Sequence, residues 1–321
     1  MRLKQSLAAA VAFVALASAA GAADLQPVLK APAAVEQQAT GYVEIYSGWG
    51  STRDTATFCD GGCDTLSFRF NGWALGGAGR ANYWMTRDVS VQVDAQAEGT
   101  SYEFIGGGGH FSSHSYLVGG HWSWRSPQQY LFGLFAAAGD AGGAGIIDSS
   151  QRHALIGAEA QWYWSQFTLY AQGGYDTTLG TIGSGFDSIN AWFLRGTSRY
   201  FVNPNFLIEG TVMYANGNID FSGRDPSTGF QTWTWGAKAE WPFPTAPFSV
   251  FAKYQGSQTK YGNSDFFAFA SAKTTDNRVL LGLKLHMGDR ALQQTDRTGA
   301  TLDIVSPLAN PTSPLMFSPA P

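Results

Sequence analysis

The sequence contains few charged residues and, after its N-terminus, no long apolar run. Asp, Glu, Lys and Arg make up 14% of the 321 residues, whereas an average soluble domain has roughly 25%. No later stretch reaches the ~18 consecutive apolar residues that a transmembrane helix needs. Since 44% of the residues are nevertheless hydrophobic, the apolar side chains are dispersed. The 39 Gly and 13 Pro residues then favour many strands joined by turns over helices.

The N-terminal residues have the order of an export signal. Arg2 and Lys4 precede an apolar run from residue 7 to residue 17, and Ala20-Gly21-Ala22 follows. This order is typical of an export signal, so residues 1–22 are predicted to be a cleaved signal peptide; the alternative is a short buried helix.

Without this segment, the chain loses two of its 20 basic residues, which leaves 18 basic against 24 acidic residues and a net charge of −6. Nucleic-acid binding is therefore not expected.

Cysteine is limited to Cys59 and Cys63, which are separated by Asp60-Gly61-Gly62. In an exported protein, two cysteines at this spacing favour a small disulfide loop. A metal site would need further ligands, and no His or additional Cys lies close in sequence. The prediction is a disulfide, with no metal and no cofactor.

Period-two alternation is clearest in the stretch VSVQVDAQAE, from Val89 to Glu98. The Val and Ala side chains fall on one face of a strand there, and the polar side chains fall on the other. A soluble sheet and a membrane barrel both produce this pattern. Similar stretches predict twelve strands, at 41–50, 66–82, 88–101, 114–125, 130–140, 152–164, 166–178, 189–202, 205–216, 231–242, 247–258 and 276–287.

The connections between these strands distinguish the two possibilities. Those after odd-numbered strands are long and polar or Gly-rich, and those after even-numbered strands are short, as in a transmembrane barrel with long extracellular loops and short periplasmic turns. Aromatic residues flank the short turns, where an interfacial girdle is expected; ordinary core aromatics are the alternative. The predicted girdle residues are Trp84, Trp122, Trp124, Trp162, Trp164, Tyr200 and Trp241.

The predicted outer face of this all-β, antiparallel, up-and-down barrel carries no charge, as a lipid-facing surface requires. The inner face is polar and mixes acidic with basic residues. It would line either a water-filled pore of weak charge selectivity or a lattice of ion pairs that fills the interior, since twelve strands lie between filled eight-stranded and open sixteen-stranded barrels. The candidate pore-lining residues are Glu44, Arg69, Asp94, Glu98, Glu159, Asp176, Arg195, Arg199, Glu209, Lys238, Glu240, Lys253 and Lys284.

Catalytic motifs are weak. His110 and His114 follow the glycines at 106–109, but the chain contains neither G-x-S-x-G nor H-E-x-x-H, and a Gly-rich loop does not position reactive groups. No catalytic residue is therefore predicted. An outer-membrane hydrolase is a remote alternative, which needs one of these histidines set against a serine or a carboxylate at the barrel rim.

The expected organisation is a signal peptide (1–22), a flexible periplasmic leader (23–40), a barrel (41–287) and a Pro-rich tail (288–321). An even number of strands returns the chain to the side where it began, so the tail is expected to extend into the periplasm. The signal, the mature start Ala23-Asp24-Leu25 with Lys30-Ala31-Pro32, and the alternating strands with aromatic girdles resemble the porin-like outer-membrane β-barrel proteins of Gram-negative bacteria. Many of these proteins end on an aromatic residue, which this chain does not.

This resemblance implies insertion into the outer membrane by the outer-membrane assembly machinery, with outer-membrane lipid and lipopolysaccharide around the barrel. It also implies either passive passage of small hydrophilic solutes or a structural role in the envelope. A structural or surface-interaction barrel with a closed lumen is the alternative to the channel.

Overall fold

The computed structural model describes residues 39–59, 62–105, 110–144, 149–182, 186–221, 224–262, 270–288 and 291–305. They belong to one compact unit that begins at Gln37. The predicted signal peptide, all but two residues of the predicted leader, and residues 306–321 of the tail lie outside the described residues.

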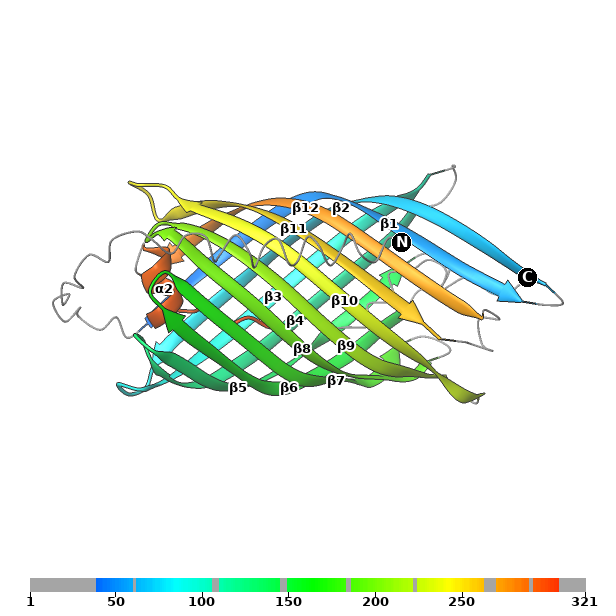
Figure 1. The fold of residues 1–321 in the computed structure, drawn as a ribbon, viewed down its shortest axis with the longest axis horizontal. Coiled ribbons are helices and arrows are strands. Elements are labelled where there is room, and N and C mark those ends of the chain that lie inside the picture. Colours follow the sequence, from blue (N-terminus) through cyan, green and yellow to red (C-terminus); the bar gives the residue numbers. More distant parts are fainter. Residues whose placement is uncertain are drawn as a thin grey trace. The chain divides into compact units, whose positions relative to one another are not determined.

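Twelve antiparallel strands follow one another around a closed barrel, in which β1 pairs with β12 (Figure 1). The prediction of an all-β up-and-down barrel is confirmed. The strands are β1 (Ala39–Cys59), β2 (Cys63–Trp84), β3 (Val89–Phe104), β4 (His110–Ser126), β5 (Tyr130–Ala144), β6 (Ser149–Trp164), β7 (Phe167–Ile182), β8 (Phe186–Asn203), β9 (Phe206–Phe221), β10 (Arg224–Pro242), β11 (Phe248–Tyr261) and β12 (Ser271–Met287).

The strands are longer than predicted. The segment 51–65, expected as a loop, is almost entirely strand, and pairing between β1 and β2 continues to Cys59 and Cys63. These two cysteines form the predicted disulfide. A strand needs only ~9–11 residues to cross a membrane, whereas β1 has 21. Beyond the membrane both faces of a strand can be polar, so the sequence there carries no period-two signal.

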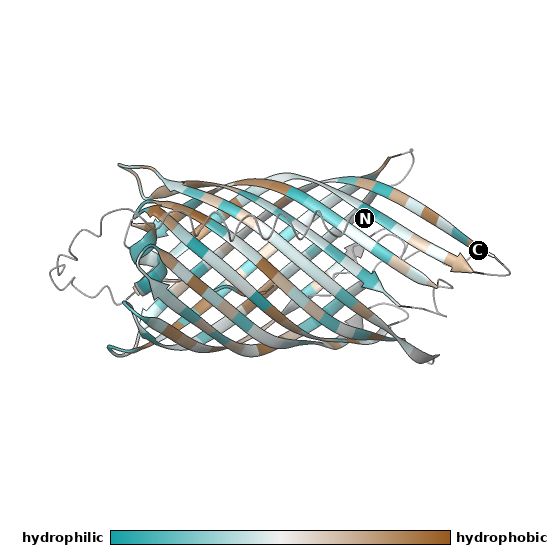
Figure 2. Cartoon of the chain, viewed as in Figure 1, coloured by the Kyte–Doolittle hydropathy of each residue, from teal (hydrophilic) through white to brown (hydrophobic). Residues whose placement is uncertain are grey.

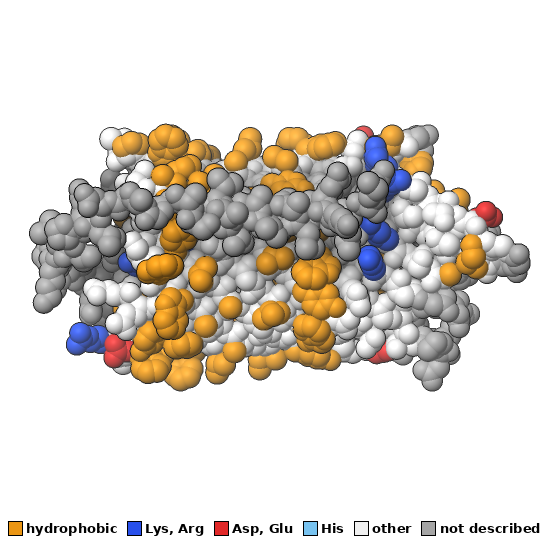
Figure 3. Space-filling view, viewed as in Figure 1, with side chains coloured by type: hydrophobic (Ala, Val, Ile, Leu, Met, Phe, Trp, Pro, Cys, Tyr) orange, Lys and Arg blue, Asp and Glu red, His pale blue; other side chains and the backbone are white. Residues whose placement is uncertain are grey.

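Apolar side chains surround the outside of the barrel in a band (Figures 2 and 3). Ile156 is 66% exposed, and Leu281 and Ile45 are similarly exposed. Such a surface is costly in water and favourable in lipid. No helix among the described residues is long and apolar enough to cross a membrane.

Strand β2 runs without a bulge near Gly72. Its pairing with β1 and with β3 continues without a shift of register through this region. Phe70 therefore points into the barrel, where it is buried, and Trp73 points outward, where it is 60% exposed. Each face of β2 simply carries an aromatic residue.

The tail does not behave as expected. Residues 292–298 form helix α2 (Leu292–Thr298), which lies at one end of the barrel (Figure 1). The Gln293 side chain donates to the backbone oxygen of Ser165, in the short turn between β6 and β7, at 2.8 Å. Residues 300–305 follow, and Leu302 and Ile304 are buried among inward-facing wall residues. The expected periplasmic extension is therefore wrong for residues 300–305, because Leu302 and Ile304 find a dry surface inside the barrel.

Candidate functional site in the lumen

One half of the lumen, along β4–β9, is filled by apolar side chains. The wall contributes apolar residues that alternate with the lipid-facing ones on the same strands. Ile304 and Val305 of the tail complete the main cluster. Its other members are Leu117, Phe135, Ala137, Leu155, Phe193, Met213 and Ala215.

A set of polar groups buried in the same half is bonded around Glu159. The Glu159 carboxylate accepts hydrogen bonds from the Tyr170 hydroxyl at 2.6 Å and the Gln172 amide at 2.9 Å. The His121 Nδ1 atom lies 2.7 Å from Glu159 Oε1, and its Nε2 atom lies 3.3 Å from Asp94 Oδ2. A buried charge is tolerated only when it is paired and hydrogen-bonded in this way, so this network holds β3, β4, β6 and β7 together.

The tail is anchored by its acidic side chains. Asp303 pairs with Arg80, with Arg199 Nη2 at 3.1 Å and with Arg195 Nη2 at 3.4 Å. Burial alone would raise the pKa of the Asp303 carboxyl, but these guanidinium groups hold that pKa well below its usual range. Arg199 also binds Asp296 of α2, at 2.7 Å. The two carboxylates of the tail thus pair with three arginines of the wall.

Backbone groups of the tail are bonded as well. The Gln92 amide group donates to the oxygen of Leu302 at 2.8 Å, and its carbonyl accepts from the nitrogen of Leu302 at 3.2 Å. Arg125, which is fully buried, donates to the oxygen of Gly299 at 3.0 Å. The Trp84 indole N–H donates to the oxygen of Thr298 at 2.8 Å. The wall therefore recognises the extended backbone of the tail as well as its side chains.

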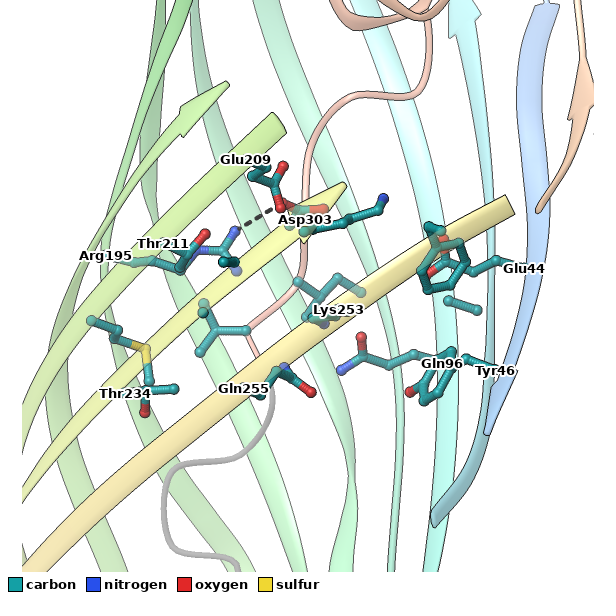
Figure 4. Close-up of a pocket in the computed structure, with 18 of the residues that line it drawn as sticks. Glu44, Tyr46, Gln96, Arg195, Glu209, Thr211, Thr234, Lys253, Gln255 and Asp303 are labelled. Carbon is teal, nitrogen blue, oxygen red and sulfur yellow. Dashed lines mark ion pairs between the residues drawn. The ribbon is translucent and has the colours of Figure 1, made fainter. Parts of the chain in front are cut away.

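The other half of the lumen contains a polar cavity of about 390 Å³ (Figure 4). Inward side chains of β8–β12 and β1–β3 line it, and the tail residues Asp303, Ile304 and Val305 form part of its boundary. Lys253, Gln255 and other polar groups point into it (Figure 4).

Ion pairs cover most of the charge in this cavity. Glu240 binds Lys238 at 2.6 Å and Lys284 at 2.7 Å, and Arg278 binds both Glu98 and Asp276. Lys253 differs, since it has no hydrogen bond or ion pair to any residue that the structure describes. Its ammonium group is therefore available to pair with a solute in the cavity.

The structure separates the thirteen predicted pore-lining residues into three groups. Nine of them line the cavity. Three others, Asp94, Glu159 and Asp176, lie in the packed half; Asp176 is 2.8 Å from His153. Arg69 is exposed on the outer face, so its assignment to the lumen is wrong. Phe68 and Trp73 fall on opposite faces of this strand, so the aromatic residues did not show which face is the outer one. The nine are Glu44, Glu98, Arg195, Arg199, Glu209, Lys238, Glu240, Lys253 and Lys284.

Six of the seven predicted girdle residues face outward. Trp122, Trp124, Trp162, Trp164 and Trp241 are exposed, and Tyr200 stacks on Phe167 with ring centroids 4.6 Å apart. Trp84 does not belong to the girdle. It faces inward, with the Arg125 guanidinium 5.2 Å from its ring centroid, and its neighbour Tyr83 takes the outward position, 47% exposed.

Several functional residues were missed from the sequence. Arg278 shares the phase of Lys284 on β12, which was a usable signal. Arg80 lies on β2, where the phase was ambiguous. Asp296 and Asp303 had no signal at all, because the tail lacks periodicity and its partners are far away in sequence.

His110 and His114 lie on β4 rather than in the glycine loop. The Nε2 atom of His114 is 3.3 Å from Asp140 Oδ1, and Ser150 donates to the same carboxylate. Ser150 and His114 therefore share one partner, the Asp140 carboxylate. Among the residues that the structure describes, no three His, Cys, Asp or Glu side chains form a group that could hold a metal ion.

No family model and no curated protein sequence matches the chain. Among solved structures, an outer membrane channel from Pseudomonas putida F1 is similar with a TM-score of 0.55 and 12% sequence identity, over 83% of this chain and 100% of that chain. A FadL homologue from Pseudomonas aeruginosa has a TM-score of 0.44 and 10% identity, over 77% of this chain and 90% of that one. The chain has the fold of the bacterial outer-membrane β-barrels, closed here by twelve strands.

Proposed function

We propose that the protein is a passive channel for small hydrophilic solutes whose lumen is closed, at the end where the short turns lie, by its own C-terminal segment. The polar cavity carries this proposal. Part of its boundary is Ala300, Asp303, Ile304 and Val305, which belong to the tail rather than to the wall. Movement of the tail would therefore enlarge the cavity without breaking any pairing between strands.

The charge around the cavity favours polar solutes of low net charge. Seven basic side chains line it: Arg80, Arg195, Arg199, Lys238, Lys253, Arg278 and Lys284. Seven acidic side chains line it too: Glu44, Glu98, Glu209, Glu240, Asp276, Asp296 and Asp303. Two of the acidic ones belong to the tail, so its departure leaves a surplus of positive charge in the lumen. The open state is then expected to prefer anions over cations.

Single-channel recording in planar bilayers tests this proposal. One variant lacks residues 288–321, and a matched control lacks only residues 306–321 and so keeps the segment seen in the lumen. The first variant should conduct at a several-fold higher level than the full chain, with a reversal potential that shows anion preference. The control should behave as the full chain does. Equal conductance of all three proteins would disprove the role of the tail as the closing element.

A structural barrel with a permanently closed lumen is the second candidate. The buried pairs of Asp303 and the docking of Leu302 and Ile304 favour it. The two candidates differ in the full chain: the channel opens transiently under voltage, and the structural barrel stays closed under every voltage and salt condition. Catalysis is not part of either proposal. A His114→Ala variant should be unchanged in lipase and protease assays relative to the full chain.

A further inference from the structure

Four exposed basic side chains lie on four neighbouring strands of the outer wall. They are Arg69 on β2, Arg53 on β1, Lys273 on β12 and Lys260 on β11. Arg53 is directly opposite Arg69, and Lys260 is directly opposite Lys273. In the space-filling view, Lys and Arg side chains gather beside the band of apolar side chains (Figure 3). We call these four residues the outer basic patch.

Charge repulsion makes this arrangement unfavourable for the protein alone. Like charges directly opposite each other on neighbouring strands are destabilising, and the patch contains two such pairs. None of its four side chains forms an ion pair with another described residue. The outward carboxylate on β3, Glu103, faces Asn71 rather than Arg69 and lies near His110. An external anion bound between the strands would offset this repulsion.

The height of the patch on the barrel indicates where that anion comes from. Trp49 and Trp73 are directly opposite each other on the outer face. They lie at the end of the apolar band that is nearer the Cys59–Cys63 hairpin. Arg53 and Arg69 lie four residues farther along their strands, toward the Cys59–Cys63 hairpin. At ~3.4 Å per residue and a strand tilt of ~40°, this is a rise of about 10 Å. This is the level at which headgroups of the leaflet on the long-hairpin side are expected.

We propose that the outer basic patch binds the phosphate groups of a phosphorylated glycolipid of the lipid A type in the outer leaflet. The two arginines offer planar, bidentate donors to one phosphate, and the two lysines add point charges for another. The acyl chains of this lipid then lie along the apolar band below the patch. This binding is independent of whether the lumen conducts.

The test measures binding of purified bisphosphorylated lipid A to the detergent-solubilised full chain by native mass spectrometry. The quadruple variant Arg53→Gln, Arg69→Gln, Lys260→Gln, Lys273→Gln should bind at least tenfold more weakly. The control is Arg87→Gln with Arg152→Gln, which neutralises two exposed basic residues outside the patch and should bind as the full chain does. Heat-modified mobility on gels verifies that each variant is folded.

Two further measurements separate phosphate recognition from general lipid adhesion. Dephosphorylated lipid A should bind the full chain as weakly as lipid A binds the quadruple variant, and raised salt should weaken the phosphorylated lipid selectively. Equal binding of both lipids, or equal binding by the quadruple variant and the control, would overturn the proposal. Displacement of lipid A by millimolar inorganic phosphate would also overturn it, because the patch would then be a simple ion site.

Discussion

The two halves of the lumen are built from the same kind of strand but differ in what fills them. Along β4–β9, apolar side chains and a hydrogen-bonded polar network fill much of the interior. Along β8–β12 and β1–β3, long charged side chains bind one another around an open space, so β8 and β9 contribute to both halves. Twelve strands enclose more volume than side chains of one wall can fill, so the packed half is completed by the tail.

The tail matches this asymmetry residue by residue. Its apolar side chains, Leu302, Ile304 and Val305, contact the apolar clusters of the packed half. Asp303 lies at the border between the halves, where Arg80, Arg195 and Arg199 converge. The difference between the halves therefore positions a closing element on one side and leaves a path on the other.

The largest effect is expected from removing Glu159 from the packed half. Glu159→Ala removes the acceptor of the Tyr170 hydroxyl and one of the two partners of both His121 and Gln172, and breaking a buried pair costs about 3–5 kcal/mol. Urea unfolding of the refolded barrel in lipid should show a clear drop in the transition midpoint. The matched change in the other half is Lys253→Ala, which breaks no pair among the described residues. Equal losses in the two variants would show that the halves do not differ as described.

A smaller loss is expected at the contact between tail and wall. Leu302 is fully buried against Leu131, Tyr163 and Tyr170, so Leu302→Ala should weaken docking of the tail by about 2–4 kcal/mol. The barrel itself should keep its unfolding midpoint, while channel openings in bilayers become more frequent. Gln294→Ala is the control, because the exposed Gln294 side chain bonds only within the tail. A lower midpoint of barrel unfolding without more frequent channel openings would contradict the assignment of Leu302 to the contact between tail and wall.

The fold was predictable because period-two alternation and the order of long and short connections are local signals. The same signals failed where the strand phase was ambiguous: Arg69 was placed in the lumen and Trp84 in the girdle, each one position out of phase. Strand ends were placed too early because polar hairpins above the membrane need no apolar face.

The closing element could not be predicted by these means. Asp303 meets Arg80 and Arg199, which are separated from it by more than one hundred positions in the sequence. The apolar inner residues Leu117, Phe135 and Phe193 looked like ordinary strand residues, because nothing local distinguishes a dry lumen from a lipid-facing surface. Only the closed barrel brings these residues and the tail together.

Acid should release the tail, with an effect confined to low pH. Asp303 has a lowered pKa in the folded chain, so its ionised form stabilises docking at every pH above its ordinary pKa of ~3.9. This stabilisation is lost as the pH falls through the lowered value, and conductance should rise there. In Asp303→Asn the contribution is already absent at neutral pH, so the variant should conduct more at pH 7 and show less acid activation. An unchanged acid response in that variant would assign the effect to other groups.

The smallest effect on stability is expected at Lys253, in the open half. Its ammonium group points into the cavity (Figure 4) and has no described partner, so Lys253→Gln should change the free energy of unfolding by no more than about 0.5 kcal/mol. The ion selectivity should change instead, because the substitution removes one positive charge from the conducting path. Made in the chain that lacks residues 288–321, it should lower the preference of that chain for anions. Lys284→Gln is the contrasting variant, since Lys284 holds Glu240 and Glu44 and its loss should reduce stability as well. If Lys253→Gln left the reversal potential unchanged while Lys284→Gln shifted it, the conducting path would follow the paired residues rather than the free ammonium group.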